Sequence, residues 1–154
     1  MMPSGIESIS IFSDLEFARL EEITAFCEKL LLVEGDVLIS ENDHSSNDLY
    51  ILFSGHIEII SNGSGVTSGD VPISKQDKEI FGEISWLTGG KRTATIRCVN
   101  EVEAVRIDGH KLSRYLEQHP DVGFAVTRRI ALLLAQRLDQ TNNLLKQVLW
   151  NSNI

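Results

Sequence analysis

The stretch FGEISWLTGGKRTAT, residues 81–95, combines an acid, a double glycine and an arginine within one short apolar run. Glu83 and Arg92 lie nine residues apart, beside residues of the type found in protein cores. The segment from Phe81 to Leu87 predicts one helical turn, and the Thr-Ala-Thr-Ile that follows Arg92 predicts a strand entering the core. Two interpretations follow: both charged side chains lie on the surface, or both are held inside the protein to bind a ligand.

The residue types around Arg92 match the chemistry of a phosphate site. A guanidinium is permanently charged and offers a planar fork of donors. Gly82 allows the backbone to approach a ligand closely, and the amide groups of a helical turn favour an anion. The Thr93 hydroxyl adds a donor, while Glu83 can accept from a sugar hydroxyl or pair with an arginine. The stretch therefore predicts a ligand with one phosphate and one nearby sugar hydroxyl.

Short β-rich runs separated by turn residues precede this stretch, and others follow it directly. These runs predict short strands. Ser54-Gly55 predicts a tight turn between two paired strands, and residues 61–70 (SNGSGVTSGD) predict a polar loop. Many short strands with close turns favour a small barrel or jelly roll, which we place at about residues 33–108. The predicted strands are Val37–Ile39, Leu49–Phe53, His56–Ile60, Thr93–Val99 and Val102–Ile107.

Helical periodicity flanks the strands on both sides. Asp14 is placed to cap a first helix, and Pro120 ends a short helix that begins near His110. The apolar residues of the first helix are Leu15, Ala18, Leu20, Ile23, Phe26 and Leu30.

A third, much longer helix is predicted at about residues 121–149, near the end of the chain. At 1.5 Å per residue it would be about 43 Å long, more than a small barrel can cover. Its outer half is therefore expected to contact a partner, and a parallel homodimer is the simplest one. The seven-residue repeat consists of Ala131, Leu134, Leu138, Leu145 and Val148, with Thr141 at the matching polar step.

Composition narrows the class of protein. The 154 residues carry a formal net charge of −8, which argues against a nucleic-acid surface and requires any anion site to be a local set of donors. No apolar run reaches membrane-spanning length, and the N-terminus is not a secretory signal. Two cysteines without a signal predict packed thiols in the cytoplasm, and we expect a single domain over residues 1–154.

At residues 81–95 the sequence resembles a known family. The run Phe81-Gly82-Glu83, followed after eight residues by Arg92-Thr93-Ala94, resembles the phosphate-binding cassette of the cyclic-nucleotide-binding domain. That domain occurs in catabolite activator proteins, regulatory subunits of protein kinase A and cyclic-nucleotide-gated channels. The resemblance extends over about residues 11–149, and it implies an α+β fold: a β-roll (double-stranded jelly roll) with an N-terminal helix and a long C-terminal helix.

The resemblance also implies roles for individual residues. Arg92 would bind the cyclic phosphate, together with Gly82, Ala94, the Thr93 hydroxyl and backbone amides near Ile84 and Ser85. Glu83 would accept from the ribose 2′-hydroxyl. In the catabolite-activator branch, an arginine of the long helix pairs with this glutamate, and a polar pair reaches the purine, one member from the partner subunit. The matching residues here are Arg137, Thr141 and Asn142.

The resemblance favours cyclic AMP as ligand, and cyclic GMP is the alternative because Thr93 is sometimes associated with it. The glycine-aspartate common before the cassette is missing from ISKQDKEI, which leaves the packing near Ile73 open. We expect a sensor that couples binding to reorientation of its C-terminal helix, without a cofactor or a metal. The alternatives are a ligand-free dimeric scaffold of the same fold, or the regulatory part of a longer transcription regulator.

An enzyme is the least favoured class. A metal-dependent barrel would need clustered ligands, whereas the four histidines are scattered and form no close pair. No serine-histidine-aspartate or cysteine-histidine arrangement has local support either. The prediction is therefore a non-catalytic domain with no metal and no catalytic residue.

Overall fold

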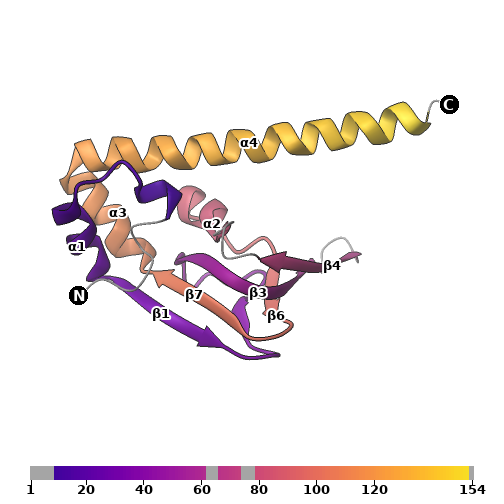
Figure 1. The fold of residues 1–154 in the computed structure, drawn as a ribbon, viewed down its shortest axis with the longest axis horizontal. Coiled ribbons are helices and arrows are strands. Elements are labelled where there is room, and N and C mark those ends of the chain that lie inside the picture. Colours follow the sequence, from indigo (N-terminus) through magenta and orange to yellow (C-terminus); the bar gives the residue numbers. More distant parts are fainter. Residues whose placement is uncertain (1–8, 62–65, 74–78, 153–154) are drawn as a thin grey trace.

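The computed structural model describes residues 9–61, 66–73 and 79–152. Its centre is a curled antiparallel roll crossed by helices on one side (Figure 1). One sheet has the order β1-β7-β3-β5, and the other has the order β2-β6-β3-β4, so that β3 belongs to both. The strands are β1 (Cys27–Leu32), β2 (Val37–Ile39), β3 (Leu49–Ser61), β4 (Val66–Ile73), β5 (Glu79–Phe81), β6 (Thr95–Cys98) and β7 (Val102–Ile107).

Strand β3 corrects one prediction. Ser54-Gly55 is not a turn between two strands, because both residues lie within β3, a single continuous strand of 13 residues. The pairing shifts register between Leu52 and Ser54, where β3 leaves β7 and goes on to pair with β6. Gly55 has a φ of +113° and lies against the backbone of the β6–β7 turn. The glycine therefore marks a bend that passes one strand from the first sheet to the second.

The polar loop predicted for residues 61–70 is also partly wrong. Residues 66–70 belong to strand β4, which pairs with β3 from Gly55↔Ile73 to Ser61↔Val66. Residues 62–65 lie outside the described part of the chain.

The N-terminal region differs from its predicted single helix. A 3-10 turn (Ser10–Phe12) precedes α1 (Phe17–Thr24), and the chain then enters β1, so Phe26 and Leu30 are not helical. Asp14 does not cap α1 and instead accepts from Arg129 of the long helix. The roll accordingly begins at Cys27 rather than near residue 33. Pairing of β1 with the full length of β7 overrides the local helical spacing.

Two clusters of buried side chains fill the molecule. One lies between the helices and the first sheet, and it includes Phe12, Ile51 and Leu112, each almost fully buried. The other lies inside the roll and includes Leu52, Ile57 and Ala104. Alternation along β3 sends Ile51 into the first cluster and Leu52 into the second, as the two-residue period of a strand requires.

The C-terminal helices match their predictions closely. α3 (Gly109–Gln118) is capped by Asp108, whose carboxylate accepts from Lys111 N at 3.0 Å, and α4 (Pro120–Ser152) begins with proline at its first position. The first part of α4 packs against the core through Val122, Val126 and Ile130. The rest projects beyond the roll (Figure 1), and no described helix is apolar enough over a sufficient length to cross a membrane.

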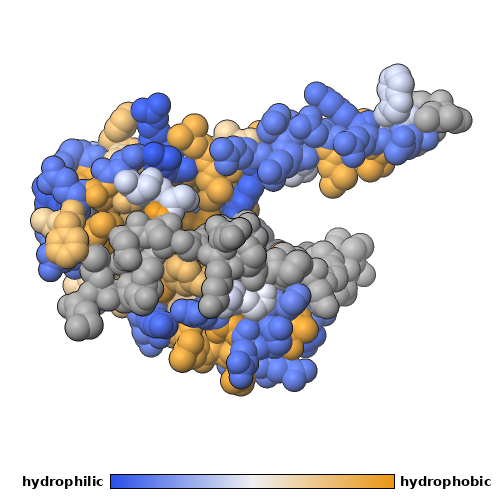
Figure 2. Space-filling model, viewed as in Figure 1, coloured by the Kyte–Doolittle hydropathy of each residue, from blue (hydrophilic) through white to orange (hydrophobic). Residues whose placement is uncertain are grey.

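The outer part of α4 presents apolar side chains to solvent. Figure 2 shows orange surface on the side of the projecting helix that faces the roll. Leu134, which the predicted repeat includes, is instead half-buried against the first core cluster. The exposed large apolar residues in this part are Leu138, Leu144, Leu145, Val148, Leu149 and Trp150.

Candidate functional site

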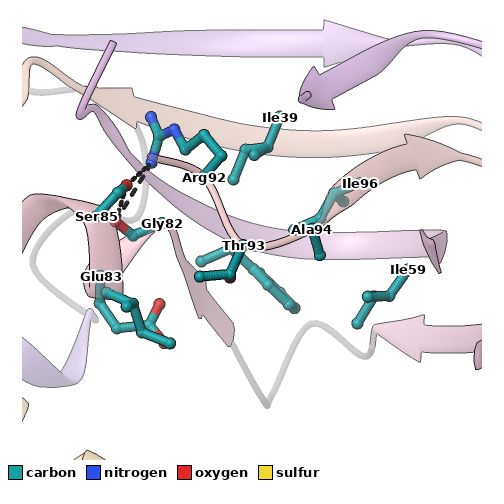
Figure 3. Close-up of a pocket in the computed structure, with 11 residues that line it drawn as sticks. Ile39, Ile59, Gly82, Glu83, Ser85, Arg92, Thr93, Ala94 and Ile96 are labelled. Atoms are coloured by element: carbon teal, nitrogen blue, oxygen red, sulfur yellow. Dashed lines mark hydrogen bonds between the residues drawn. The ribbon is translucent and has the colours of Figure 1, made fainter. Parts of the chain in front are cut away.

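A cavity of about 160 Å³ opens beside α2 (Glu83–Thr88), the short helix predicted within residues 81–95. Its walls come from β2, β3, β5, α2, the loop that follows α2, and β6 (Figure 3). The structure thus brings together seven of the ten predicted site residues. The lining residues are Ile39, Ile59, Phe81, Gly82, Glu83, Ile84, Ser85, Arg92, Thr93, Ala94 and Ile96.

Two glycines in the left-handed conformation frame α2. Gly82 has φ +89° at the N-cap and Gly89 has φ +73° at the C-cap, so the helix is limited to six residues. Gly82 also has no room for a side chain, because a Cβ there would lie 2.7 Å from both Arg92 Nη1 and the Asp48 carbonyl oxygen. A Cβ at Gly89 would meet nothing within 4 Å. Only the first glycine is therefore required by packing as well as by backbone conformation.

Arg92 is a buried cation, with 3% of its surface exposed. Its guanidinium donates to Ser85 Oγ at 2.7 Å, to the Asp48 carbonyl at 2.9 Å and to the Gly82 carbonyl at 3.3 Å. Figure 3 shows it turned toward Ser85 and Gly82. A longer contact of 3.4 Å joins Nη2 to Ser46 Oγ. All four acceptors are uncharged oxygens.

Among the described residues, no carboxylate lies within ion-pair distance of Arg92. The pKa of exposed Asp43 is lowered, first because Ser45 donates to its carboxylate and only in smaller part because of Arg92. A buried charge is costly unless it is both hydrogen-bonded and paired with an opposite charge. Arg92 has the hydrogen bonds but not the counter-charge, and an anion entering the cavity would supply it.

Glu83 connects the cavity to the long helix. Its side chain is buried, and Oε1 accepts from Arg137 Nη1 at 2.9 Å. Arg137 also donates through Nη2 to the Ile80 carbonyl at 2.9 Å. One side chain of α4 therefore contacts both the cassette helix and strand β5. The pairing of Glu83 with Arg137 that the resemblance implied is present.

Thr141 and Asn142 do not line the cavity. Both are exposed on α4, and the Thr141 hydroxyl donates to the Arg137 carbonyl one turn earlier in the same helix. Their contact with a purine remains a prediction that depends on a second subunit.

Sequence reasoning missed the apolar walls of the cavity and two supports of Arg92. Ile39, Ile59 and Ile96 come from three separate strands, and nothing in the spacing of these residues marks them as neighbours of Arg92. Ser46 and Asp48 contact the guanidinium from a loop 44 to 46 residues away. The side chain of Ile73, whose packing was left open, lies outside the described side chains.

The described residues around the cavity offer hydrogen-bond donors and acceptors to a ligand. Within the described ranges, no group of three or more histidine, cysteine, aspartate or glutamate side chains is arranged to hold a metal ion. A guanidinium that has no carboxylate partner among the described residues, beside a carboxylate that can accept several hydrogen bonds, suits a ligand that is anionic at one end and hydroxylated nearby.

Comparison with known proteins gives the same ligand class. The family model of the cyclic nucleotide-binding domain matches residues 30–119. The CRP-like cAMP-activated global transcriptional regulator of Mycobacterium tuberculosis is 26% identical over 142 residues, which cover 91% of this chain and 60% of that protein. A cAMP-dependent protein kinase regulatory subunit of Blastocladiella emersonii is 27% identical over 123 residues, covering 79% and 30%. The chain thus spans less than two thirds of the length of each of these relatives.

Solved structures agree on the fold. A cyclic nucleotide-binding domain from Methylobacillus flagellatus superposes with a TM-score of 0.72 at 18% identity, covering 90% of this chain and 76% of that one. The catabolite activator protein of Thermus thermophilus gives 0.68 at 22% identity, covering 90% and 62%. Because the family model spans more than half of the residues and the fold agrees, this chain belongs to the cyclic nucleotide-binding domain family.

Proposed function

We propose that this chain is a sensor of a cyclic mononucleotide, cyclic AMP being favoured, that couples binding to reorientation of helix α4. The observation that carries the proposal is the buried guanidinium of Arg92, which faces one cavity with Glu83 and lacks a counter-charge among the described residues. Two relatives named above are cAMP-activated or cAMP-dependent by name. Other relatives are cyclic nucleotide-gated channels, whose names do not specify the base. Cyclic AMP is favoured because Glu83 pairs with Arg137, as the resemblance to the catabolite-activator branch implied.

Arg92 would bind the cyclic phosphate by exchanging some of its present acceptors. Its bonds to the Ser85 and Ser46 hydroxyls are the easiest to replace, since a hydroxyl can rotate and donate to the incoming phosphate instead. The first turn of α2 adds backbone amides that have no acceptor inside the helix. Thr93, exposed at the cavity wall, adds a further donor.

Glu83 would bind the ribose while it keeps its contact with Arg137. Oε1 accepts from Arg137, and a carboxylate accepts several hydrogen bonds. A ribose hydroxyl at Glu83 would therefore alter the bond that holds α4 to α2. This differential contact is what allows binding at the cavity to bias the orientation of α4.

A second copy of the chain would contact and recognise the base of the nucleotide. Thr141 and Asn142 project from the exposed part of α4, next to the apolar residues Leu138 and Leu145. In a parallel homodimer those apolar residues would be covered, and one copy's Thr141 or Asn142 would approach the other copy's purine. The proposed domain is regulatory and non-catalytic, and the location proposed for it is the cytoplasm.

A thermal-shift titration with cyclic AMP, cyclic GMP and 5′-AMP tests the proposal. A ligand at 100 times its Kd stabilises the folded state by about 2.7 kcal/mol. For a chain of this size we therefore expect cyclic AMP to raise Tm by about 5–11 °C. Cyclic GMP should give a smaller rise and 5′-AMP the smallest. A Tm that no ligand changes would instead favour the ligand-free scaffold, and the Thr141→Ala protein should lose part of the preference for cyclic AMP.

The two glycines of α2 provide a matched pair of variants. Gly82→Ala and Gly89→Ala each place a side chain on a left-handed residue, at a cost of about 1–2 kcal/mol in folding stability. Only Gly82→Ala also pushes a Cβ against Arg92 and Asp48. We expect it to weaken cyclic AMP binding by about tenfold or more, corresponding to about 1.4 kcal/mol. Gly89→Ala should leave the affinity measured by calorimetry nearly unchanged, and equal losses in both proteins would contradict this reading.

A further inference from the structure

A second hollow lies at the free edge of the roll and shares no lining residue with the cavity beside α2. Its volume is about 340 Å³. The register pairs Leu31 with Glu103 and Leu32 with Val102, which places the four residues along one end of the β1–β7 pair. The lining residues are Leu31, Leu32, Val33, Ser54, Glu101, Val102 and Glu103.

The hollow is lined by both apolar and acidic side chains. Leu31, near the end of β1, and Val33, directly after the strand, are 77% and 58% exposed and form a small apolar surface together. In Figure 2, orange patches alternate with blue ones along the lower edge of the molecule, where Figure 1 places β1. Glu101 is exposed and Glu103 is partly exposed, and the chain as a whole is acidic. Of these two carboxylates, Glu103 forms an ion pair with Lys29 at 3.5 Å.

Strand β1 adds an open backbone edge to the hollow. Within the described residues β1 pairs only with β7, so its other edge presents backbone donors and acceptors to solvent. An extended segment can add to such an edge as a further strand, with backbone bonds for affinity and side-chain pockets for specificity. The edge is firmly placed, because Gly35 N donates to the Cys98 carbonyl and Val33 N to the Asp36 carboxylate.

We propose that this edge docks an extended segment of a partner protein that carries an aliphatic side chain flanked by lysine or arginine. The aliphatic side chain would pack against the exposed side chains of Leu31 and Val33, and a cation would contact the exposed Glu101. Charge argues against a second copy of this chain as the occupant. Each copy carries a net charge of −8 and an exposed Glu101 at this edge, so two copies would repel each other there.

The test uses the whole chain and three blocked pentapeptides: Lys-Thr-Leu-Thr-Lys, Glu-Thr-Leu-Thr-Glu and Lys-Thr-Ser-Thr-Lys. We expect only the first to cause saturable shifts in the backbone amide resonances of residues 29–33 and 101–103. Those shifts should weaken as salt is raised, because screening reduces the attraction between the charges. They should be unaffected by cyclic AMP bound at the other site, so this result is independent of the proposed function.

Variants at exposed positions complete the test without threatening the fold. Glu101→Lys and Leu31→Ser should each reduce the affinity for the first peptide at least fivefold. Val37→Ser, on a valine of β2 that is 50% exposed, should leave this affinity unchanged. Equal shifts with the glutamate peptide, or none with any peptide, would overturn the proposal. Self-association that Leu31→Ser abolishes in sedimentation would also overturn it, in favour of a second copy.

Discussion

Arg92→Ala is expected to weaken cyclic AMP binding by about 2–5 kcal/mol, or about 30- to 5,000-fold. The size follows from burial: the guanidinium is almost fully enclosed, and the phosphate that would provide its counter-charge would be left unpaired in the same enclosed space. Isothermal calorimetry with cyclic AMP measures the loss directly. The same measurement with adenosine, which has no phosphate, should show little difference between the two proteins.

The measurement with adenosine distinguishes the loss of the phosphate contact from a general distortion of the site. Arg92 also holds Ser85, Gly82 and Asp48 together, so its removal is expected to cost some folding stability. Arg92→Lys keeps the positive charge but loses the planar fork of donors. Its affinity for cyclic AMP should therefore lie between those of the wild type and Arg92→Ala. Lys91→Ala, on the exposed neighbouring residue, serves as the matched control. An Arg92→Ala protein that binds cyclic AMP as tightly as the wild type would exclude the phosphate role.

Gly55→Ala is expected to lower the free energy of unfolding by about 2–5 kcal/mol. Two costs add: a left-handed backbone conformation, about 1–2 kcal/mol, and overpacking, about 1–3 kcal/mol. A Cβ at this position would lie 2.4 Å from the Glu101 carbonyl oxygen and 2.8 Å from Val102 Cγ2. The β6–β7 turn would have to move, and it is connected to both sheets of the roll. Urea denaturation measures the change.

Gly35→Ala isolates the conformational part of that cost. Gly35 has a similar φ of +91°, but a Cβ there would meet nothing within 4 Å. We expect this variant to lose only about 1–2 kcal/mol. If Gly55→Ala were no more destabilised than Gly35→Ala, β3 would tolerate a side chain where it passes between the sheets. The structural role given to that bend would then be wrong.

Local patterns predicted the elements whose contacts are close in sequence. The cassette helix and the glycines around it lie within a few residues of one another, and the long helix carries its own periodicity. Pairing between distant segments decided the rest. Residues 27–32 look helical by spacing, yet they form β1 because β7, some 75 residues later, offers a complete antiparallel partner.

The residues of the candidate site likewise divide into those that the local sequence identifies and those that depend on contacts between distant segments. Glu83 and Arg92 are recognisable because both belong to one stretch, and the Arg137 pairing was reached only through resemblance to a family. Ser46 and Asp48 were not predicted, because a serine and a backbone carbonyl in a polar loop resemble any other turn. The apolar walls of the cavity depend on how two sheets curl together, which the spacing of Ile39, Ile59 and Ile96 does not encode.

The position of Arg137 within α4 has a mechanical consequence. The ion pair with Glu83 lies near the middle of the helix, and the 15 residues from there to Ser152 extend about 22 Å at 1.5 Å per residue. If the helix pivots at this clamp, a tilt of about 10° displaces its tip by about 4 Å over that length. Under the proposed function, helix α4 would be a lever with its fulcrum at the cavity beside α2. A change in one ion pair, too small to deform the roll, would then become a displacement large enough for a partner to detect.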